Sequence, residues 1–207
     1  MGKGRLEAFS DGVIGVAITL LVLNLRFDDD PSTALTTQLG EHWPSFAAYV
    51  VSFFIIGVIW LNHHQLFQLV TAIDMRVMVY NLVMLLFVTA IPFTTATYAN
   101  YVQAGGTSAR TSVILYGLVM EGMAIGFMLI LVRLVRAGLL DPKVSPSQVR
   151  SLLIRNGLRI VVYLVIIVVG AFNPLIMLIL YVAIIGIYTV PTLRAFSADT
   201  PTSGRQS

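Results

Sequence analysis

The chain has 207 residues, of which 57% are hydrophobic and 11% are charged, and it contains no cysteine. This composition is far more apolar than that of a soluble domain, so it excludes a soluble globular protein and predicts an integral membrane protein. The absence of cysteine excludes disulfide bonds and thiolate chemistry. The formal net charge is only +3, so the placement of the charges matters more than their sum.

Six apolar stretches are each long enough to cross a bilayer, which takes about 20 helical residues. Strands are disfavoured, since open sheets cannot satisfy their backbone groups in lipid and the stretches lack polar–apolar alternation. We therefore expect an all-α membrane protein with six transmembrane helices, at residues 7–26, 45–69, 77–101, 111–135, 151–172 and 174–193. Residues 1–195 are expected to form this domain, and 196–207 a short disordered cytoplasmic tail.

The first span carries a serine and an acid at its start. Ser10 and Asp11 lead directly into the uncharged stretch 12–25, and no convincing cleavage site follows that would make it a signal peptide. These uncharged residues reach only about 21 Å, less than the roughly 30 Å hydrocarbon core. An ionisable side chain costs about 2.5–3.5 kcal/mol there. Ser10 and Asp11 are therefore expected to be drawn towards the interior or to face protein.

Val16, Leu20 and Leu23 fall at i, i+4 and i+7 on the first span, with Thr19 beside Val16. This spacing predicts a stripe of three apolar side chains and one hydroxyl. The stripe has two interpretations: an ordinary helix-packing seam, or the lining of a pore.

Three acids follow the first span. Asp28, Asp29 and Asp30 would ring the outer mouth of a symmetric oligomer and concentrate cations there, or would form an ordinary solvated loop.

The second span ends with Trp60, Asn62, His63 and His64, at the membrane depth where Ser10 and Asp11 begin the first. A buried acid beside an imidazole and an indole N–H has the hydrogen-bond partners it needs, and Arg5 would add a charge. We expect a network that fixes the first helix against the second; a proton relay is the alternative. Adjacent histidines point about 100° apart on a helix, so they do not chelate one metal.

Polar groups also occur in the third and fourth spans. Asn81 is expected to bond between helices, with no chemical role. Glu121 lies about 15 Å into the fourth span and fits either a proton path or a tethered hydrogen bond. The long cytoplasmic loop follows at 138–148, with Pro142 and Pro146.

The distribution of Lys and Arg among the loops predicts how the chain is oriented in the membrane. With the N-terminus inside, 11 of the 13 Lys and Arg residues fall on the cytoplasmic side and only Arg26 and Arg110 lie outside. We expect a multi-pass protein of the cell membrane with both termini cytoplasmic. The net charge follows from topology and lends no support to a nucleic-acid partner.

The segment Arg5-x-x-x-Phe9-Ser10-Asp11-Gly12 with Val13–Thr19, together with Trp60-x-Asn62-His63-His64, resembles the transmembrane protein 175 family of potassium channels. The resemblance implies four six-helix subunits around an axis lined by the first helix; a single repeat implies a homotetramer. It implies a hydrophobic bottleneck at Val16, a threonine layer tied to potassium selectivity at Thr19, and an apolar lining at Leu20 and Leu23. The family more often has isoleucine or leucine at the bottleneck, so Val16 implies a wider constriction.

The resemblance also implies that the network orients the pore helix. Its candidate members are Arg5, Phe9, Ser10, Asp11, Trp60, Asn62, His63 and His64.

The sequence thus predicts a potassium-permeable cation channel whose partners are the bilayer, potassium ions and further copies of the chain, with no cofactor. A carbonyl filter of the Thr-Val-Gly-Tyr-Gly type is missing, because the one Thr-Val pair, Thr189-Val190, precedes Pro191. The alternative is a proton-coupled transporter that uses Asp11, His64 and Glu121. An enzyme is not expected, since spacing alone defines no catalytic triad.

Overall fold

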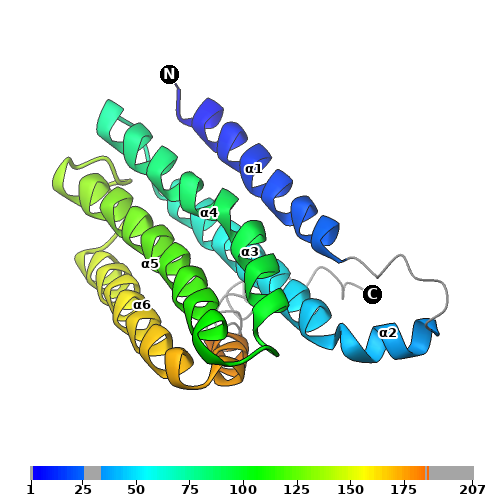
Figure 1. Ribbon diagram of the computed structural model, residues 1–207. Helices are drawn as coiled ribbons and strands as arrows, with labels where there is room; N and C mark the ends of the chain where they lie inside the picture. The colour runs from blue at the N-terminus through cyan, green and yellow to red at the C-terminus, as the bar shows by residue number, and fades with distance from the viewer. Residues whose placement is uncertain (1, 26–33, 185, 187–207) are drawn as a thin grey trace, which may run out of the picture.

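The computed structural model describes residues 2–25, 34–184 and 186. The described part is helical, as Figure 1 shows, and five of its helices are long and apolar enough to cross a membrane. The elements are α1 (Lys3–Leu20), the 3-10 helix η1 (Leu21–Asn24), α2 (Leu35–Glu41), α3 (Trp43–Gln68), α4 (Met75–Tyr101), α5 (Gly106–Arg136) and α6 (Pro146–Phe172). A shorter apolar helix follows at Pro174–Ile184.

The prediction of an all-helical membrane protein is confirmed. The sixth expected span is described as helix only as far as Ile184. The rest of that span, Asp28, Asp29 and Asp30, and the expected tail at 196–207 lie outside the described residues.

Several helices begin earlier than their apolar cores, and polar residues cap two of them, α4 and α6. The α6 helix starts at Pro146 behind a reciprocal capping box of Ser145 and Gln148. The first helix begins at Lys3 instead of residue 7, so α1 and η1 together span about 35 Å. The first span is therefore long enough to cross once its polar first turns are counted.

Glycine and proline mark two of the connections between helices. Gly105 and Gly106 have φ of 66° and 62°, which glycine adopts without strain, and they connect α4 to α5. The α6 helix stops at Phe172, and a new helix begins at Pro174. The short α2, outside the expected spans, precedes α3.

The α4 helix is central: it packs against α1 and α3 on one side and against α5 on the other, and α5 packs in turn against α6 (Figure 1). A Cβ at Gly126 of α5 would lie only 2.9 Å from the Cα of Met84, so glycine is what allows α4 and α5 to approach this closely. The result is a bundle in which α1 lies at one edge and α6 at the other.

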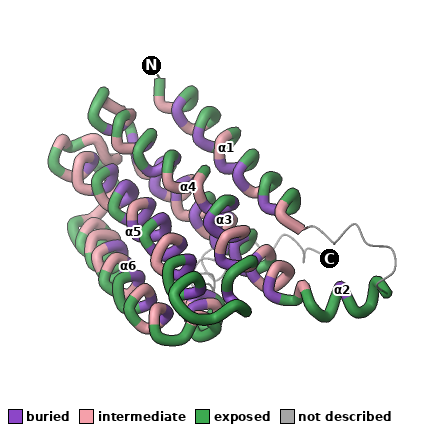
Figure 2. The backbone as a smooth tube through the Cα atoms, in the orientation of Figure 1, coloured by how far each residue is buried: buried purple, intermediate pink, exposed green. Residues whose placement is uncertain are grey.

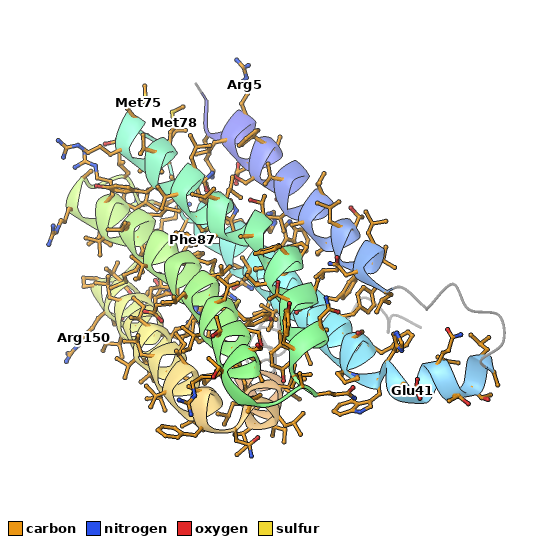
Figure 3. All side chains as sticks on the ribbon, in the orientation of Figure 1. Arg5, Glu41, Met75, Met78, Phe87 and Arg150 are labelled. Atoms are coloured by element: carbon orange, nitrogen blue, oxygen red, sulfur yellow. The ribbon has the colours of Figure 1, made fainter. Side chains whose placement is uncertain are left out.

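One end of the bundle, here called the basic end, holds the start of α1 and the α3–α4 and α5–α6 loops. Lys3 Nζ donates to the Val70 carbonyl at 2.8 Å, and Thr71 N donates to the Leu139 carbonyl at 3.0 Å. Asp74 caps α4 and pairs with Arg133, whose guanidinium holds the pKa of the Asp74 carboxyl below its ordinary value. Arg5, Met75 and Met78 lie at this end in Figure 3, and Glu41 lies at the opposite end.

Candidate functional site

The α1 helix has two distinct faces. Leu6, Ser10, Ile14 and Ala17 are buried, and η1 continues this stripe with Leu21. The opposite face is open, as the green bands on α1 in Figure 2 indicate. Val16 is 56% exposed and Leu23 60%, and Thr19 and Leu20 are exposed beside them. The stripe predicted from spacing therefore lies on the exposed face of α1 and η1 within the subunit.

Three buried polar side chains from three helices form a hydrogen-bond chain across α1, α4 and α3. His63 Nε2 lies 2.9 Å from Asn81 Oδ1, and Asn81 Nδ2 donates to Ser10 Oγ at 2.9 Å. Ser10 Oγ in turn donates to the Leu6 carbonyl at 2.9 Å. Because an amide oxygen only accepts, His63 Nε2 carries the proton in this arrangement. Every bond of the chain then runs in one direction, towards α1.

A second contact joins α3 to α1, at the edge of the exposed face of α1. Trp60 Nε1 donates to Asp11 Oδ1 at 2.9 Å. The His64 ring stacks on the Trp60 ring, with centroids 5.8 Å apart, and Gln68 Nε2 lies 3.0 Å from His64 Nε2. Asp11 is thus exposed with an indole partner, while its neighbour Ser10 is fully buried.

The far end of α1 is also tied to α4. Asn24, at the end of η1, donates through Nδ2 to the Pro92 carbonyl at 3.0 Å. Together with the Ser10–Asn81 bond, this contact holds α1 against α4 at two levels, so the buried stripe cannot turn outward without breaking both.

Three expected network members take no part in it. Arg5 is exposed, and within residues 2–25 and 34–184 it forms no ion pair with Asp11, because six residues place the two side chains about 120° apart around the helix. Phe9 is 46% exposed. Asn62 donates to the Val58 carbonyl of its own helix at 2.7 Å, since two residues turn it about 160° away from Trp60.

The alternative proton site does not assemble within the subunit. Asp11 and His64 both contact Trp60, but Glu121 lies on α5, which α4 separates from α1. Glu121 is 6% exposed, and its Oε2 has no hydrogen-bond partner among the described residues. Over the described residues there is no group of three or more His, Cys, Asp or Glu that could hold a metal ion.

Residues 5–92 match the family described as the endosomal/lysosomal potassium channel TMEM175. Over 158 residues the chain is 44% identical to a potassium channel of Streptomyces collinus, covering 75% of this chain and 76% of that protein. The chain belongs to the TMEM175 family. The matched TMEM175 region runs from α1 into α4 and contains the whole Ser10–Asn81–His63 chain.

Two solved TMEM175 structures resemble this one. The crystal structure of a lysosomal potassium-selective channel TMEM175 homolog from Chamaesiphon minutus has a TM-score of 0.78 and 28% identity, covering 91% of this chain and 97% of that chain. The potassium channel MtTMEM175 has a TM-score of 0.60 at 20% identity, covering 94% of this chain and 91% of that chain, which shows the fold alone.

Asn81 bonds between helices as expected, but its position between Ser10 and His63 at the centre of the hydrogen-bond chain was not predicted. The depth of the two residues along their helices could have indicated the contact between Asn81 and Ser10. Asn81 comes about 9 Å after the start of α4 and Ser10 about 10 Å after the start of α1, and both helices begin at the basic end.

Replacing Asn81 tests how much this chain stabilises the subunit. Asn81→Leu keeps the branched shape and the number of side-chain heavy atoms but leaves the buried His63 N–H without an acceptor, so we expect the purified protein to lose about 1–3 kcal/mol of stability. The readout is thermal unfolding in detergent.

The control is Thr94→Val on the same helix, because the buried Thr94 hydroxyl bonds only to carbonyls of α4. Equal unfolding temperatures for the two variants would mean that Asn81 contributes nothing beyond packing.

Proposed function

We propose that the chain forms a homotetrameric potassium-permeable cation channel in which α1 lines the central pore. The observation that carries the proposal is the open face of α1, with Val16, Thr19 and Leu23 outward while the opposite stripe is packed and hydrogen-bonded. The named relatives support the permeant ion, since the Streptomyces collinus protein is called a potassium channel and the Chamaesiphon minutus homolog potassium-selective.

Val16 is the proposed constriction. Four copies of a small branched side chain around one axis make an apolar ring, and such rings stop ions by excluding water. Leu20 and Leu23 extend the apolar wall towards the outer end. Because valine is smaller than isoleucine or leucine, this ring is wider than one built from either.

Thr19 is the proposed selectivity layer, one turn outward from Val16. Its hydroxyl hydrogen is used within the helix, because Oγ1 donates to the Val16 carbonyl at 2.8 Å. The lone pairs of the same oxygen remain to face the axis as acceptors. Four such oxygens can replace part of the hydration shell of a potassium ion.

Asp11 stays off the ion path in this proposal. Its carboxylate accepts the Trp60 N–H, and with the Ser10–Asn81–His63 chain it holds the rotation of α1 so that Val16 and Thr19 face the axis. Asp28, Asp29 and Asp30 are proposed to attract cations at the outer mouth. The basic end, which holds both loops, is proposed to face the cytoplasm.

Flux through the purified protein tests this function. Liposomes that contain the full chain should release potassium down its gradient with no proton gradient imposed, when a membrane-permeant anion leaves with the potassium and balances its charge, because the proposed pore needs no coupling ion. Protein-free liposomes are the control, and release is followed with an external potassium electrode. Release that needs a proton gradient would reject the channel and favour coupled transport.

The role of Thr19 is tested by Thr19→Ala, which should lower the preference for potassium over sodium several-fold while conduction persists. The measurement is the reversal potential with potassium on one side and sodium on the other.

Thr89→Ala is the matched control, because the exposed Thr89 hydroxyl likewise donates three residues back, to the Leu86 carbonyl at 2.9 Å. If both variants keep the wild-type reversal potential, Thr19 has no part in selectivity.

A further inference from the structure

Two adjoining cavities lie where α4 ends and α5 begins, at the end of the bundle opposite the basic end. The first measures about 310 Å³ and lies between the last turns of α4 and the first turns of α5. The second measures about 380 Å³ and lies between the α4–α5 connection and the turn that follows α6. Thr107 lines both cavities, and Tyr101, Thr107 and Arg110 are exposed, so a ligand can enter from outside the subunit. Each volume is about ten times or more the roughly 30 Å³ that a water molecule takes up, which is enough for a small polar group.

The first cavity presents oxygen atoms that accept hydrogen bonds. Three of the hydroxyls that line it donate their own hydrogen to a carbonyl of the same helix at 2.8 or 2.9 Å: those of Thr97, Thr111 and Ser112. The lone pairs of these oxygens remain available as acceptors. Tyr101, which is 47% exposed, adds the face of an aromatic ring, and such faces attract cations. The first cavity therefore suits a group that is positively charged and donates hydrogen bonds, as an ammonium does.

The second cavity presents hydrogen-bond donors. Arg110 Nε donates to the Ala171 carbonyl at 3.1 Å, which holds the guanidinium beside the end of α6. The other guanidinium nitrogens of Arg110 form no hydrogen bond or ion pair with the residues that the structure describes. Asn173 Oδ1 accepts from Leu175 N at 3.2 Å, so the Asn173 Nδ2 hydrogens remain as donors. Asp and Glu are absent from the described residues that line either cavity, so the second cavity suits an anion such as phosphate.

Both cavities lie at the depth of lipid headgroups. The 31 residues of α5 reach about 46 Å, so each end of a centred α5 extends about 8 Å beyond a hydrocarbon core of roughly 30 Å. Arg110 comes only about 6 Å after the start of α5, which places it beside the headgroups. Phe93, one turn before Thr97, and Leu118, two turns after Thr111, are 64% and 54% exposed and continue an apolar surface towards the middle of the membrane. A phospholipid in one leaflet has the same order of polar and apolar parts.

We propose that the two cavities bind the headgroup of phosphatidylethanolamine, a zwitterionic phospholipid with a primary ammonium. The ammonium lies among the hydroxyl oxygens of Thr97 and Thr111, the phosphate diester contacts Arg110, and an acyl chain lies along Phe93 and Leu118. Arg110 and Thr111 are consecutive residues, so the two subsites are neighbours, as the ammonium and the phosphate are in this headgroup. The site is formed by α4, α5 and the turn after α6, so it is separate from α1 and does not rest on the proposed pore.

The test uses the full chain purified in neutral detergent and mixed with phosphatidylethanolamine or with phosphatidylcholine of the same acyl chains. Retained lipid is counted by native mass spectrometry. We expect the wild type to retain phosphatidylethanolamine in clear preference, because choline carries the same phosphate but has no N–H to donate. Equal retention of the two lipids would overturn the ammonium site.

Thr97→Val removes one of the proposed acceptors and should lower the preference for phosphatidylethanolamine over phosphatidylcholine several-fold. The matched control is Thr89→Val on the same helix, because the Thr89 hydroxyl also donates to a backbone carbonyl but does not line the cavity. Thr89→Val should keep the wild-type preference. The same preference in both variants would overturn the role of the hydroxyl oxygens.

Arg110→Gln should lower the retention of both lipids about tenfold, because it removes a charge-assisted contact to the phosphate that they share. Arg136→Gln is its control: Arg136 is exposed at the other end of α5, and its loss removes the same charge. Equal retention by the two arginine variants would overturn the phosphate subsite.

Two further ligands separate this lipid from related ones. Phosphatidylglycerol has the phosphate without the ammonium and should be retained less than phosphatidylethanolamine; a preference for it would mean that charge alone attracts lipid and would overturn the proposal. Soluble phosphoethanolamine lacks acyl chains and should be retained far less than the lipid. Retention equal to that of the lipid would overturn a membrane lipid as the ligand.

Discussion

The arrangement of this subunit depends on one constraint: polar side chains that enter an apolar bundle must find partners there. Ser10, Asn81 and His63 are all buried, and each satisfies another in a single hydrogen-bond chain across three helices. Turning α1 by one residue, about 100°, would bring Asp11 into the place of Ser10, bury its carboxylate and break the hydrogen bond that it accepts from Trp60. The rotation of α1 is therefore set by hydrogen bonding as well as by its apolar stripe.

A fixed rotation has consequences on the other side of the helix. Ala17 is fully buried and its neighbour Val16 is more than half exposed, so one residue separates the packed face from the open face. Asn24 holds the far end of α1 to the Pro92 carbonyl, and Lys3 holds the near end to the Val70 carbonyl. Because α1 is held at both ends and also at Ser10, its open face keeps one orientation, as a helix that lines a pore requires.

The sequence predicts those features that depend on the length of an apolar stretch or on the depth of a residue in the membrane. Apolar stretches of sufficient length predicted the helices, and matched depth placed Ser10 near His63. The sequence does not predict contacts that depend on the direction of a side chain around its helix. Arg5 has a suitable depth but lies on a different side of α1 from Asp11, and Asn62 likewise lies on a different side of α3 from Trp60. The sequence pattern likewise does not show which helix lies between two others, so the separation of Glu121 from Asp11 became clear only with α4 in place.

The sequence contains no cysteine, so an introduced thiol directly tests whether the open face of α1 lines an ion path. Val16→Cys in a tetramer would place four thiols around one axis, where they bind cadmium, a soft cation that prefers thiolates. If α1 lines the pore, cadmium should block potassium flux through Val16→Cys and leave both the wild type and Ala17→Cys, on the buried face, unaffected. Flux through Val16→Cys that persists in cadmium, or block of Ala17→Cys in its place, would contradict this role of α1.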